Sequence, residues 1–261
     1  MRWIEDLGRY VIGLVSETGR MANFLWEAIS WLFRPPFRAK VFLEQFIFVA
    51  NKSLFIVALT SIFTGMVFAV QTYFGFKIIK ADGLVGPTTA VAYVRELGPV
   101  FTAIVVTGRC GAAMAAQLGT MRVTEQIDAL DVMAVSSMQY LVAPRVLASF
   151  IEMPLLCCLF IFIGNIGSYF TGTVLLGIDP VIYFAHLQDF ITVRDIWQGL
   201  IKAAVFGIIF STVGTYKGYN TQGGAEAVGK STNEAVVTTL VLILVSDYFL
   251  TMMIRALLYK D

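Results

Sequence analysis

Two long stretches of the chain carry no charged residue, and they constrain the fold more than any other feature. One covers residues 53–76, between Lys52 and Lys77. The other covers residues 153–178. The hydrocarbon core of a bilayer is about 30 Å thick, and a helix needs about 20 mainly apolar residues to cross it. Both stretches are long enough, so the chain is expected to be an integral membrane protein built from helices.

The composition points the same way. Hydrophobic residues make up 57% of the 261 residues and charged residues 14%, whereas a soluble domain carries about a quarter charged residues. The net charge of +1 provides no basic surface for nucleic acid. Three cysteines and one histidine, His186, are too few for a disulfide framework or for a typical zinc site with about four ligands. We expect no nucleic-acid partner, no metal and no catalytic residue.

Three more stretches are apolar but contain charged residues. The predicted fold is all-α and crosses the membrane five times, at about 53–76, 84–118, 147–178, 197–216 and 235–257. Lys and Arg residues outside these spans are more numerous on the side of the N-terminus. Because basic residues accumulate in cytoplasmic loops, the N-terminus is expected inside the cell and the C-terminus outside.

The first 50 residues differ, because charged and apolar side chains are interleaved. The apolar residues recur at helical spacing and include Trp3, Leu7, Tyr10, Leu14, Phe24, Ala28, Ile29 and Leu32. This pattern predicts an amphipathic helix that lies in the membrane interface. Pro35 and Pro36 are expected to end that helix and turn the chain toward the first span. The chain therefore divides into an interfacial helix and elbow, residues 1–50, and a five-span domain, residues 51–261.

Four charged residues lie well inside apolar segments, namely Arg95, Glu96, Lys202 and Asp247. Each would cost about 2.5–3.5 kcal/mol if it faced lipid, so all four are expected to face protein or water. Lys202 and Asp247 are expected to pair, because their spans are consecutive in the chain. Two interpretations stay open. The charges form an ion-pair network that keeps the helices in register, or they line a polar patch in a cavity.

Gly98 and Pro99 weaken the helix that carries the first two of these charges. Pro99 cannot donate a hydrogen bond to the carbonyl of Arg95, four residues earlier, and Gly98 lowers the helix propensity further. The sequence therefore predicts a kink between residues 95 and 99.

Aromatic residues crowd one end of the first span. They form either an interfacial aromatic belt or the wall of an apolar pocket, and they are Phe68, Tyr73, Phe74 and Phe76. Under the second interpretation, Leu97 joins them as a candidate lipid-pocket residue.

Residues 224–231 match the phosphate-binding motif G-x-x-x-x-G-K-[ST]. That motif needs a preceding strand and a following helix in a large α/β core, whereas here it lies in a short loop between two predicted spans. Asp247 also follows Ser231 too closely to leave room for the helix and crossover before a Walker B acid. Nucleotide binding by this chain is not expected.

The segment 119–135, between the second and third spans, predicts a short amphipathic helix. Its apolar stripe consists of Val123, Ile127, Leu130 and Ala134. Its acidic stripe consists of Glu125, Asp128 and Asp131. Such a helix on the cytoplasmic membrane surface is either a docking element for a motor protein or an ordinary loop helix.

Three motifs resemble one known family. They are Arg95-Glu-Leu-Gly-Pro99, Gly108-Arg-Cys-Gly-Ala-Ala113 and Gly119-x-Met-Arg-Val-Thr-Glu-Gln-Ile-Asp-Ala-Leu130. These motifs closely resemble the MlaE (YrbE-type) permeases, the membrane subunits of ABC transporters that work with MCE-domain proteins in bacterial phospholipid traffic. The resemblance covers roughly residues 35–257.

The resemblance implies a multi-pass protein of the bacterial inner membrane that forms a homodimer with N-terminal elbow helices. It implies a cytoplasmic ABC ATPase as partner, which would hold the ATP and dock near Arg122, Glu125, Gln126 and Asp128. It also implies a periplasmic MCE-domain protein, and it leaves room for a small cytoplasmic STAS-domain protein. Phospholipid would be the substrate, in an apolar cavity at the dimer interface, and this chain would bind no cofactor.

By the same resemblance, the four intramembrane charges would serve conformational coupling or contact with the lipid headgroup. Two other classes of function compete. A proton-coupled secondary transporter would use Glu96 and Asp247 as relay groups. A membrane-embedded lipid-modifying enzyme would need a nucleophile, a base or a metal set, and none is recognisable in the sequence.

Overall fold

The structure is a computed structural model, and it describes residues 2–35, 38–185 and 187–258. His186 and Pro36 lie outside the described residues. Within them every regular element is a helix. In chain order the elements are α1 (Arg2–Leu32), α2 (Ala39–Lys77), η1 (Asp82–Leu84), α3 (Val85–Ala92), η2 (Tyr93–Leu97), α4 (Gly98–Val106), η3 (Thr107–Gly111), α5 (Ala112–Val123), α6 (Gln126–Val132), η4 (Met138–Val142), α7 (Ala143–Phe170), η5 (Thr171–Leu175), α8 (Pro180–Ala185), α9 (Leu187–Phe190), α10 (Val193–Tyr219) and α11 (Ala225–Leu258).

Five helical stretches are long and apolar enough to cross a membrane, as predicted. They are Ala39–Lys77, Asp82–Val123, Met138–Leu175, Val193–Tyr219 and Ala225–Leu257. Most extend beyond the apolar stretches, because charged residues at helix ends reach the aqueous boundary. The third begins before residue 147 but ends at Leu175 and not at residue 178. Gly177, with φ of 73°, turns the chain out of the helix there.

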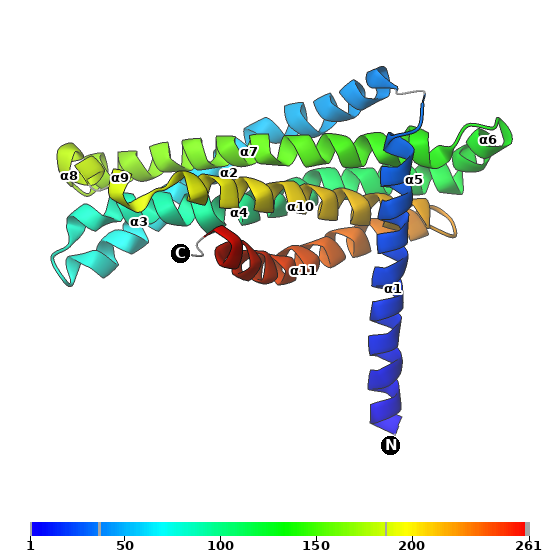
Figure 1. Cartoon of the computed structure of the whole chain (residues 1–261), viewed down its shortest axis with the longest axis horizontal. Coiled ribbons are helices and arrows are strands. Elements are labelled where there is room, and N and C mark those ends of the chain that lie inside the picture. The colour runs from blue at the N-terminus through cyan, green and yellow to red at the C-terminus, as the bar shows by residue number, and fades with distance from the viewer. Residues whose placement is uncertain (1, 36–37, 186, 259–261) are drawn as a thin grey trace.

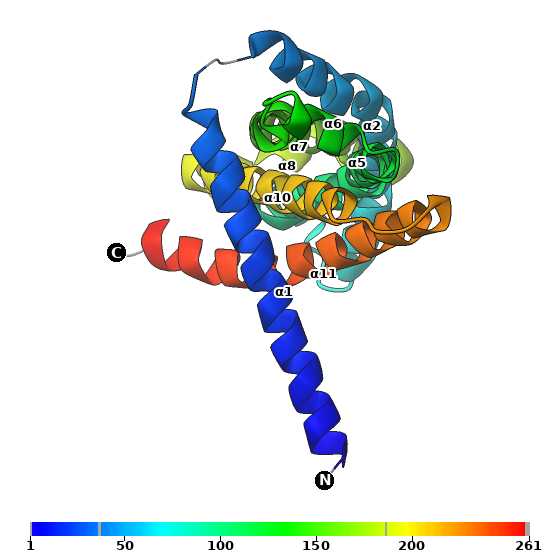
Figure 2. The ribbon, with the colours of Figure 1, turned by 90° about the vertical axis from the view of Figure 1, so that its right-hand side faces the viewer.

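Most of the long stretches run along one axis and form a bundle with two ends, while α11 crosses them obliquely (Figures 1 and 2). We call one the α8 end, where η1, α8 and α9 lie, and the other the α6 end, where α6 and residues 220–224 lie. Helix α1 does not join the bundle. It crosses the α6 end, and its N-terminal part projects beyond the other helices (Figure 2).

Helix α1 is held at its C-terminal half. Phe24 and Ala28 are buried there, and the Phe24 ring lies 5.4 Å from that of Tyr216 in α10, centroid to centroid. The helix ends at Leu32, before Pro35, while α2 begins at Ala39 and continues without a break through residue 51. The first helix therefore ends just before Pro35, where the sequence predicts its end, and α2 begins within the segment 1–50.

Glycines bring α2 and α7 into close contact. A Cβ atom added at Gly65 would collide with the carbonyl of Gly164, and one added at Gly164 would collide with the ring of Tyr93. Small residues at such crossings let helix backbones approach closely in a membrane. The main apolar core lies beside this crossing, around Tyr93, Phe160 and Phe206.

Candidate functional site

Lys202 in α10 is the centre of a buried ion-pair cluster. Its side chain is fully buried, and its Nζ lies 2.5 Å from Oε2 of Glu96 in η2 and 2.9 Å from Oδ1 of Asp247 in α11. The second contact is an ion pair without hydrogen-bond geometry. The expected pair of Lys202 and Asp247 is confirmed, and Glu96 joins it as a second carboxylate. One cation thus links three helical segments.

Arg95 has a partner that the sequence analysis did not identify. Its Nε donates a hydrogen bond of 2.7 Å to Oδ1 of Asp195, whose side chain is fully buried in the first turn of α10. The other carboxylate oxygen of Asp195 accepts hydrogen bonds from the backbone N–H and the hydroxyl of Thr192. Asp195 therefore caps α10 and neutralises Arg95 at once. The spacing Thr192-x-x-Asp195 is a capping-box pattern. From this pattern the capping role of Asp195 could have been predicted.

A π-helical turn positions Arg95 and Glu96. In η2 the backbone N–H of Gly98 donates to the carbonyl of Tyr93, five residues earlier, directly before Pro99. The structure thus places a π-turn at residues 93–97, where the sequence predicts a kink. Such turns are frequent at functional sites, because they redirect side chains within a continuous helix.

Gly199 lets α10 approach this turn. A Cβ atom added there would collide with the carbonyl oxygen of Val94. The close approach brings Gln198 and Lys202 of α10 to Glu96, with Gln198 Nε2 at 3.5 Å from Glu96 Oε1. The side chain of Glu96 stays 41% exposed, so the cluster is not sealed inside the protein.

A cavity of about 450 Å³ opens beside the cluster. It is lined by both polar and apolar residues from several helices: Thr88, Val91, Ala92, Arg95, Glu96, Phe190, Gln198, Thr251 and Arg255. The two interpretations of the intramembrane charges are thus compatible, because Glu96 takes part in the ion-pair cluster and also lines the cavity.

A second cavity, of about 380 Å³, lies between α2 and α4 and is mainly apolar. Phe68 and Leu97, two of the candidate lipid-pocket residues, both line it, together with Phe63, Thr64, Val67, Gln71 and Phe101. Since Glu96 lines the polar cavity and Leu97 the apolar one, consecutive residues of η2 face the two cavities. Tyr73 and Phe76 do not line this cavity, and pack instead beside Val85, Ile178 and Tyr183 at the α8 end.

A second buried polar cluster holds the first part of α2. Arg109 Nη2 donates to the carbonyls of Phe48 and Val49, at 2.9 and 3.1 Å. Glu152, which is 1% exposed, accepts from the backbone N–H of Ala50 at 3.1 Å. In the sequence, Arg109 stands out only as part of the motif Gly108-Arg-Cys-Gly-Ala-Ala113, and Glu152 only precedes the uncharged stretch 153–178. Their shared contact with α2 could not be predicted from either feature.

The sequence predicts one helix over residues 119–135, but the structure divides this segment into two helices. Helix α5 continues to Val123, and Glu125, with φ of 59°, separates it from α6. Ile127 is fully buried, while Glu125, Asp128 and Asp131 are exposed. Of the expected apolar stripe Ile127 is buried, but Ala134 is exposed, and the stripe is divided between helices that meet at a left-handed residue.

The expected docking residues lie around that turn. Arg122 Nη1 lies 2.5 Å from Oδ1 of Asp128, and both side chains are well exposed, at 36% and 54%. Gln126 donates to the Thr124 hydroxyl at 2.9 Å. The neighbouring apolar residues Val132 and Met133 are 88% and 64% exposed, although they belong to the same short segment.

The phosphate-loop motif has no phosphate-loop structure. All of residues 225–231 lie in the first turns of α11, and only Gly224 precedes the helix. The prediction that the whole motif lies in a short loop is wrong, because the helix begins at Ala225. No strand precedes the motif within residues 187–224. A helical backbone cannot wrap around a nucleotide phosphate as the motif requires.

Comparison with known proteins identifies the family. The family model described as "Permease MlaE" matches residues 42–253. The chain belongs to the MlaE permease family. A "Probable ABC transporter permease protein" of Rickettsia bellii is 39% identical over 94% of this chain and 95% of its own length.

Two further relatives of this MlaE-family chain have names that refer to lipids. The "Intermembrane phospholipid transport system permease protein MlaE" of Haemophilus influenzae is 32% identical over 96% of this chain and 97% of its own length. The "Protein TRIGALACTOSYLDIACYLGLYCEROL 1, chloroplastic" of Arabidopsis thaliana is 39% identical over 80% of this chain and 60% of its own length. This chain is thus a multi-pass membrane protein of a family of ABC transporter permeases, and its Rickettsia and Haemophilus relatives are named as permeases.

Proposed function

We propose that this chain is the permease subunit of an ABC transporter that moves phospholipids between the inner and outer bacterial membranes. The observation that carries the proposal is the pair of cavities on the two sides of η2. A polar cavity with Arg95 and an apolar cavity with Leu97 are separated by one turn of helix. A phospholipid needs both environments, because its phosphate is charged and its chains are apolar.

The polar cavity suits the headgroup. Arg95 and Arg255 both line it, and guanidinium groups bind phosphate oxygens through two parallel hydrogen bonds. The side chain of Arg95 is 35% exposed and lines the cavity, where its positive charge would attract a phosphate group. Phe68 and Leu97 would contact acyl chains in the apolar cavity, while Tyr73 and Phe76 would stabilise the α8 end.

The Lys202 cluster would couple ligand binding to helix movement. Its three members lie on η2, α10 and α11, and Glu96 also lines the polar cavity. A charged headgroup beside Glu96 changes the electrostatic energy of the cluster, which biases the packing of three helices together. A relay of protons through Glu96 and Asp247, as in a secondary transporter, would require both carboxylates to leave Lys202 during transport.

The α6 end would face the cytoplasm, with the N-terminus inside and the C-terminus outside. Helix α1 crosses this end (Figure 2), as an elbow helix in the membrane interface would. A cytoplasmic ATPase would dock on the turn between α5 and α6, where Val132 and Met133 are exposed beside the acidic residues. ATP hydrolysis would occur on that partner and not on this chain, and a small STAS-domain protein would bind the same assembly.

The α8 end would face the periplasm and an MCE-domain protein. The working unit would be a homodimer in the inner membrane, so that the cavities of two copies together enclose the lipid. No cofactor bound by this chain takes part in the proposal.

The deciding experiment is affinity purification of the tagged chain from its native membrane in mild detergent, followed by mass spectrometry of proteins and lipids. The proposal expects an ABC ATPase, an MCE-domain protein and phospholipid. Reconstitution of that complex in liposomes should then show ATP-dependent lipid movement. A chain that purifies alone and lipid-free, and whose uptake follows a pH gradient without ATP, would overturn the proposal in favour of proton-coupled transport.

A further inference from the structure

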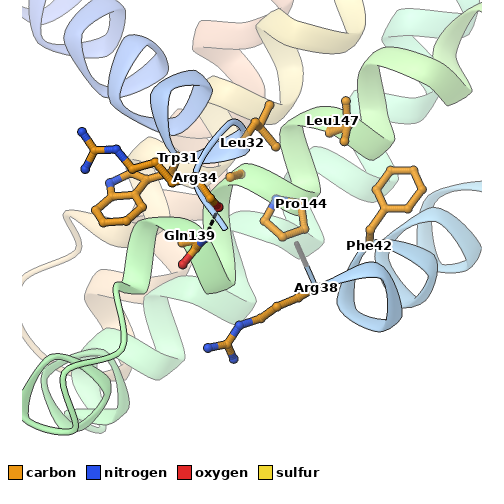
Figure 3. A pocket seen from close by; sticks show the side chains of 9 residues that line it. Trp31, Leu32, Arg34, Arg38, Phe42, Gln139, Pro144 and Leu147 are labelled. Carbon is orange, nitrogen blue, oxygen red and sulfur yellow. Dashed lines mark hydrogen bonds between the residues drawn. The ribbon is translucent and has the colours of Figure 1, made fainter. Parts of the chain in front are cut away.

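A small pocket at the α6 end has the features of an anion site outside the two cavities of η2. It lies where the end of α1, the start of α2, η4 and the first turns of α7 meet (Figure 3). Its lining combines two arginines and a glutamine with apolar and aromatic side chains: Trp31, Leu32, Arg34, Arg38, Phe42, Gln139, Ala143, Pro144 and Leu147.

The two arginines of this pocket are stacked on aromatic rings. The guanidinium carbon of Arg34 lies 4.6 Å from the centroid of the Trp31 ring, and that of Arg38 lies 4.9 Å from the centroid of Tyr140. Stacking covers the faces of a guanidinium but leaves its N–H edges free. Within the described part of the chain, neither guanidinium contacts a carboxylate, in contrast to Arg95 and Arg122.

The pocket is held in place by a hydrogen bond. Gln139 Nε2 donates to the carbonyl of Arg34 at 2.8 Å, which ties the end of α1 to η4 (Figure 3). Both guanidinium groups point away from Pro144, Phe42 and Leu147 (Figure 3). The arginines thus lie on two sides of the pocket entrance with their charged groups directed outward, and the apolar residues lie behind them (Figure 3).

The apolar side of the pocket continues along the outer surface of the bundle. One helical turn beyond Phe42 is Phe46, whose ring lies 6.0 Å from that of Phe42. One turn beyond Leu147 is Ile151, which is 40% exposed. A charged entrance beside an apolar strip matches a phospholipid that stands in the bilayer with its headgroup at the interface.

We infer that this pocket binds the phosphate group of an anionic membrane lipid. The enclosed volume is only about 20 Å³, enough for a group of the size of one water molecule. Only one phosphate oxygen therefore enters the pocket. The rest of the headgroup lies outside the pocket, between Arg34 and Arg38. The lipid ties α1 to α2 and α7, and it is a bound structural lipid and not the transported substrate.

The test uses the full chain purified in detergent, with phosphatidylglycerol and phosphatidylcholine as probes and native mass spectrometry as readout. Phosphatidylglycerol should bind the wild type more tightly, and the double variant R34Q/R38Q should bind it about tenfold more weakly, since two charge-assisted contacts are lost. The matched control K40Q/K230Q removes two positive charges from the same end without touching the pocket. It should bind as the wild type does.

Two further measurements keep the result decisive. If R34Q/R38Q does not fold, a photoactivatable phosphatidylglycerol is crosslinked to the wild type, and the label should map to residues 31–35, 38–42 and 139–147. Glycerol 3-phosphate should compete only weakly, because it lacks the acyl chains that the apolar strip contacts. Equal loss of binding in both double variants, no loss in R34Q/R38Q, labels confined to the η2 cavities, or saturation by glycerol 3-phosphate would each overturn the inference.

Discussion

Charged residues solve different problems in the interior beside η2 and at the α6 end. In the interior, the fully buried Lys202 contacts two carboxylates, and Arg95 contacts the fully buried Asp195. At the α6 end, Arg122 and Asp128 form a well-exposed pair, and Arg34 and Arg38 stack on rings. Lys202 and Asp195 are fully buried, where no water stabilises a lone charge, so each needs a protein partner. At the α6 end, water and lipid headgroups stabilise the charged side chains.

The largest effect is expected at Lys202. The variant K202A leaves Glu96 and Asp247 without their cation in a poorly hydrated site, and breaking a buried pair on one side costs about 3–5 kcal/mol. The measurement is unfolding in mixed micelles by titration with a denaturing detergent, together with lipid transport. Because two carboxylates are involved, the triple variant K202A/E96Q/D247N should recover a large part of the stability. A triple variant no more stable than K202A would refute the ion-pair cluster.

The same contrast explains what could be predicted from the sequence. The cost of a charge in lipid identified Arg95, Glu96, Lys202 and Asp247 without any structure, and chain order identified one of their pairs. It could not reveal that Glu96 shares Lys202, because that contact depends on the π-turn of η2 and on the approach of α10 at Gly199.

The spans were predictable for a similar reason, and the local breaks were not. Apolar length alone identified five membrane crossings. Helical periodicity did not show that Glu125 adopts a left-handed conformation and divides the segment 119–135. It also could not separate Phe68, which lines the apolar cavity, from Tyr73 and Phe76, which pack at the α8 end. Such differences arise from tertiary packing of residues that are far apart in the chain.

The next effect concerns backbone approach in the interior. The variant G199A places a Cβ atom against the carbonyl of Val94, and neither backbone can move without disturbing η2. Overpacking of this kind costs about 1–3 kcal/mol. The control G229A, on α11 at the α6 end, has no atom within 4 Å of its new Cβ. It should be neutral or stabilising by up to about 1 kcal/mol, since alanine favours a helix. Detergent-titrated unfolding compares the two, and equal losses would contradict the proposed close approach.

A smaller effect is expected for Asp195. The variant D195N removes the negative charge that faces Arg95, but its side-chain oxygen can still accept a hydrogen bond from the backbone of Thr192. Arg95 is 35% exposed, so water compensates part of the loss, and about 1–2 kcal/mol of stability should disappear. The control T192A removes the Thr192 hydroxyl from the capping box but leaves the ion pair of Arg95 and Asp195 in place, so it should cost less. If T192A were as harmful as D195N, helix capping and not the ion pair would be the main role of Asp195.

The smallest change in stability is expected at the α6 end. The variant R122Q/D128N removes an exposed ion pair, and such pairs contribute about 0–1 kcal/mol. Its effect should appear in assembly instead, because these side chains lie on the turn that we propose as the ATPase docking surface. Co-purification of the ATPase with the tagged chain should fall while detergent-titrated unfolding stays near that of the wild type. A stability loss above about 2 kcal/mol with unchanged co-purification would assign Arg122 and Asp128 a structural role and remove the contrast between the two regions.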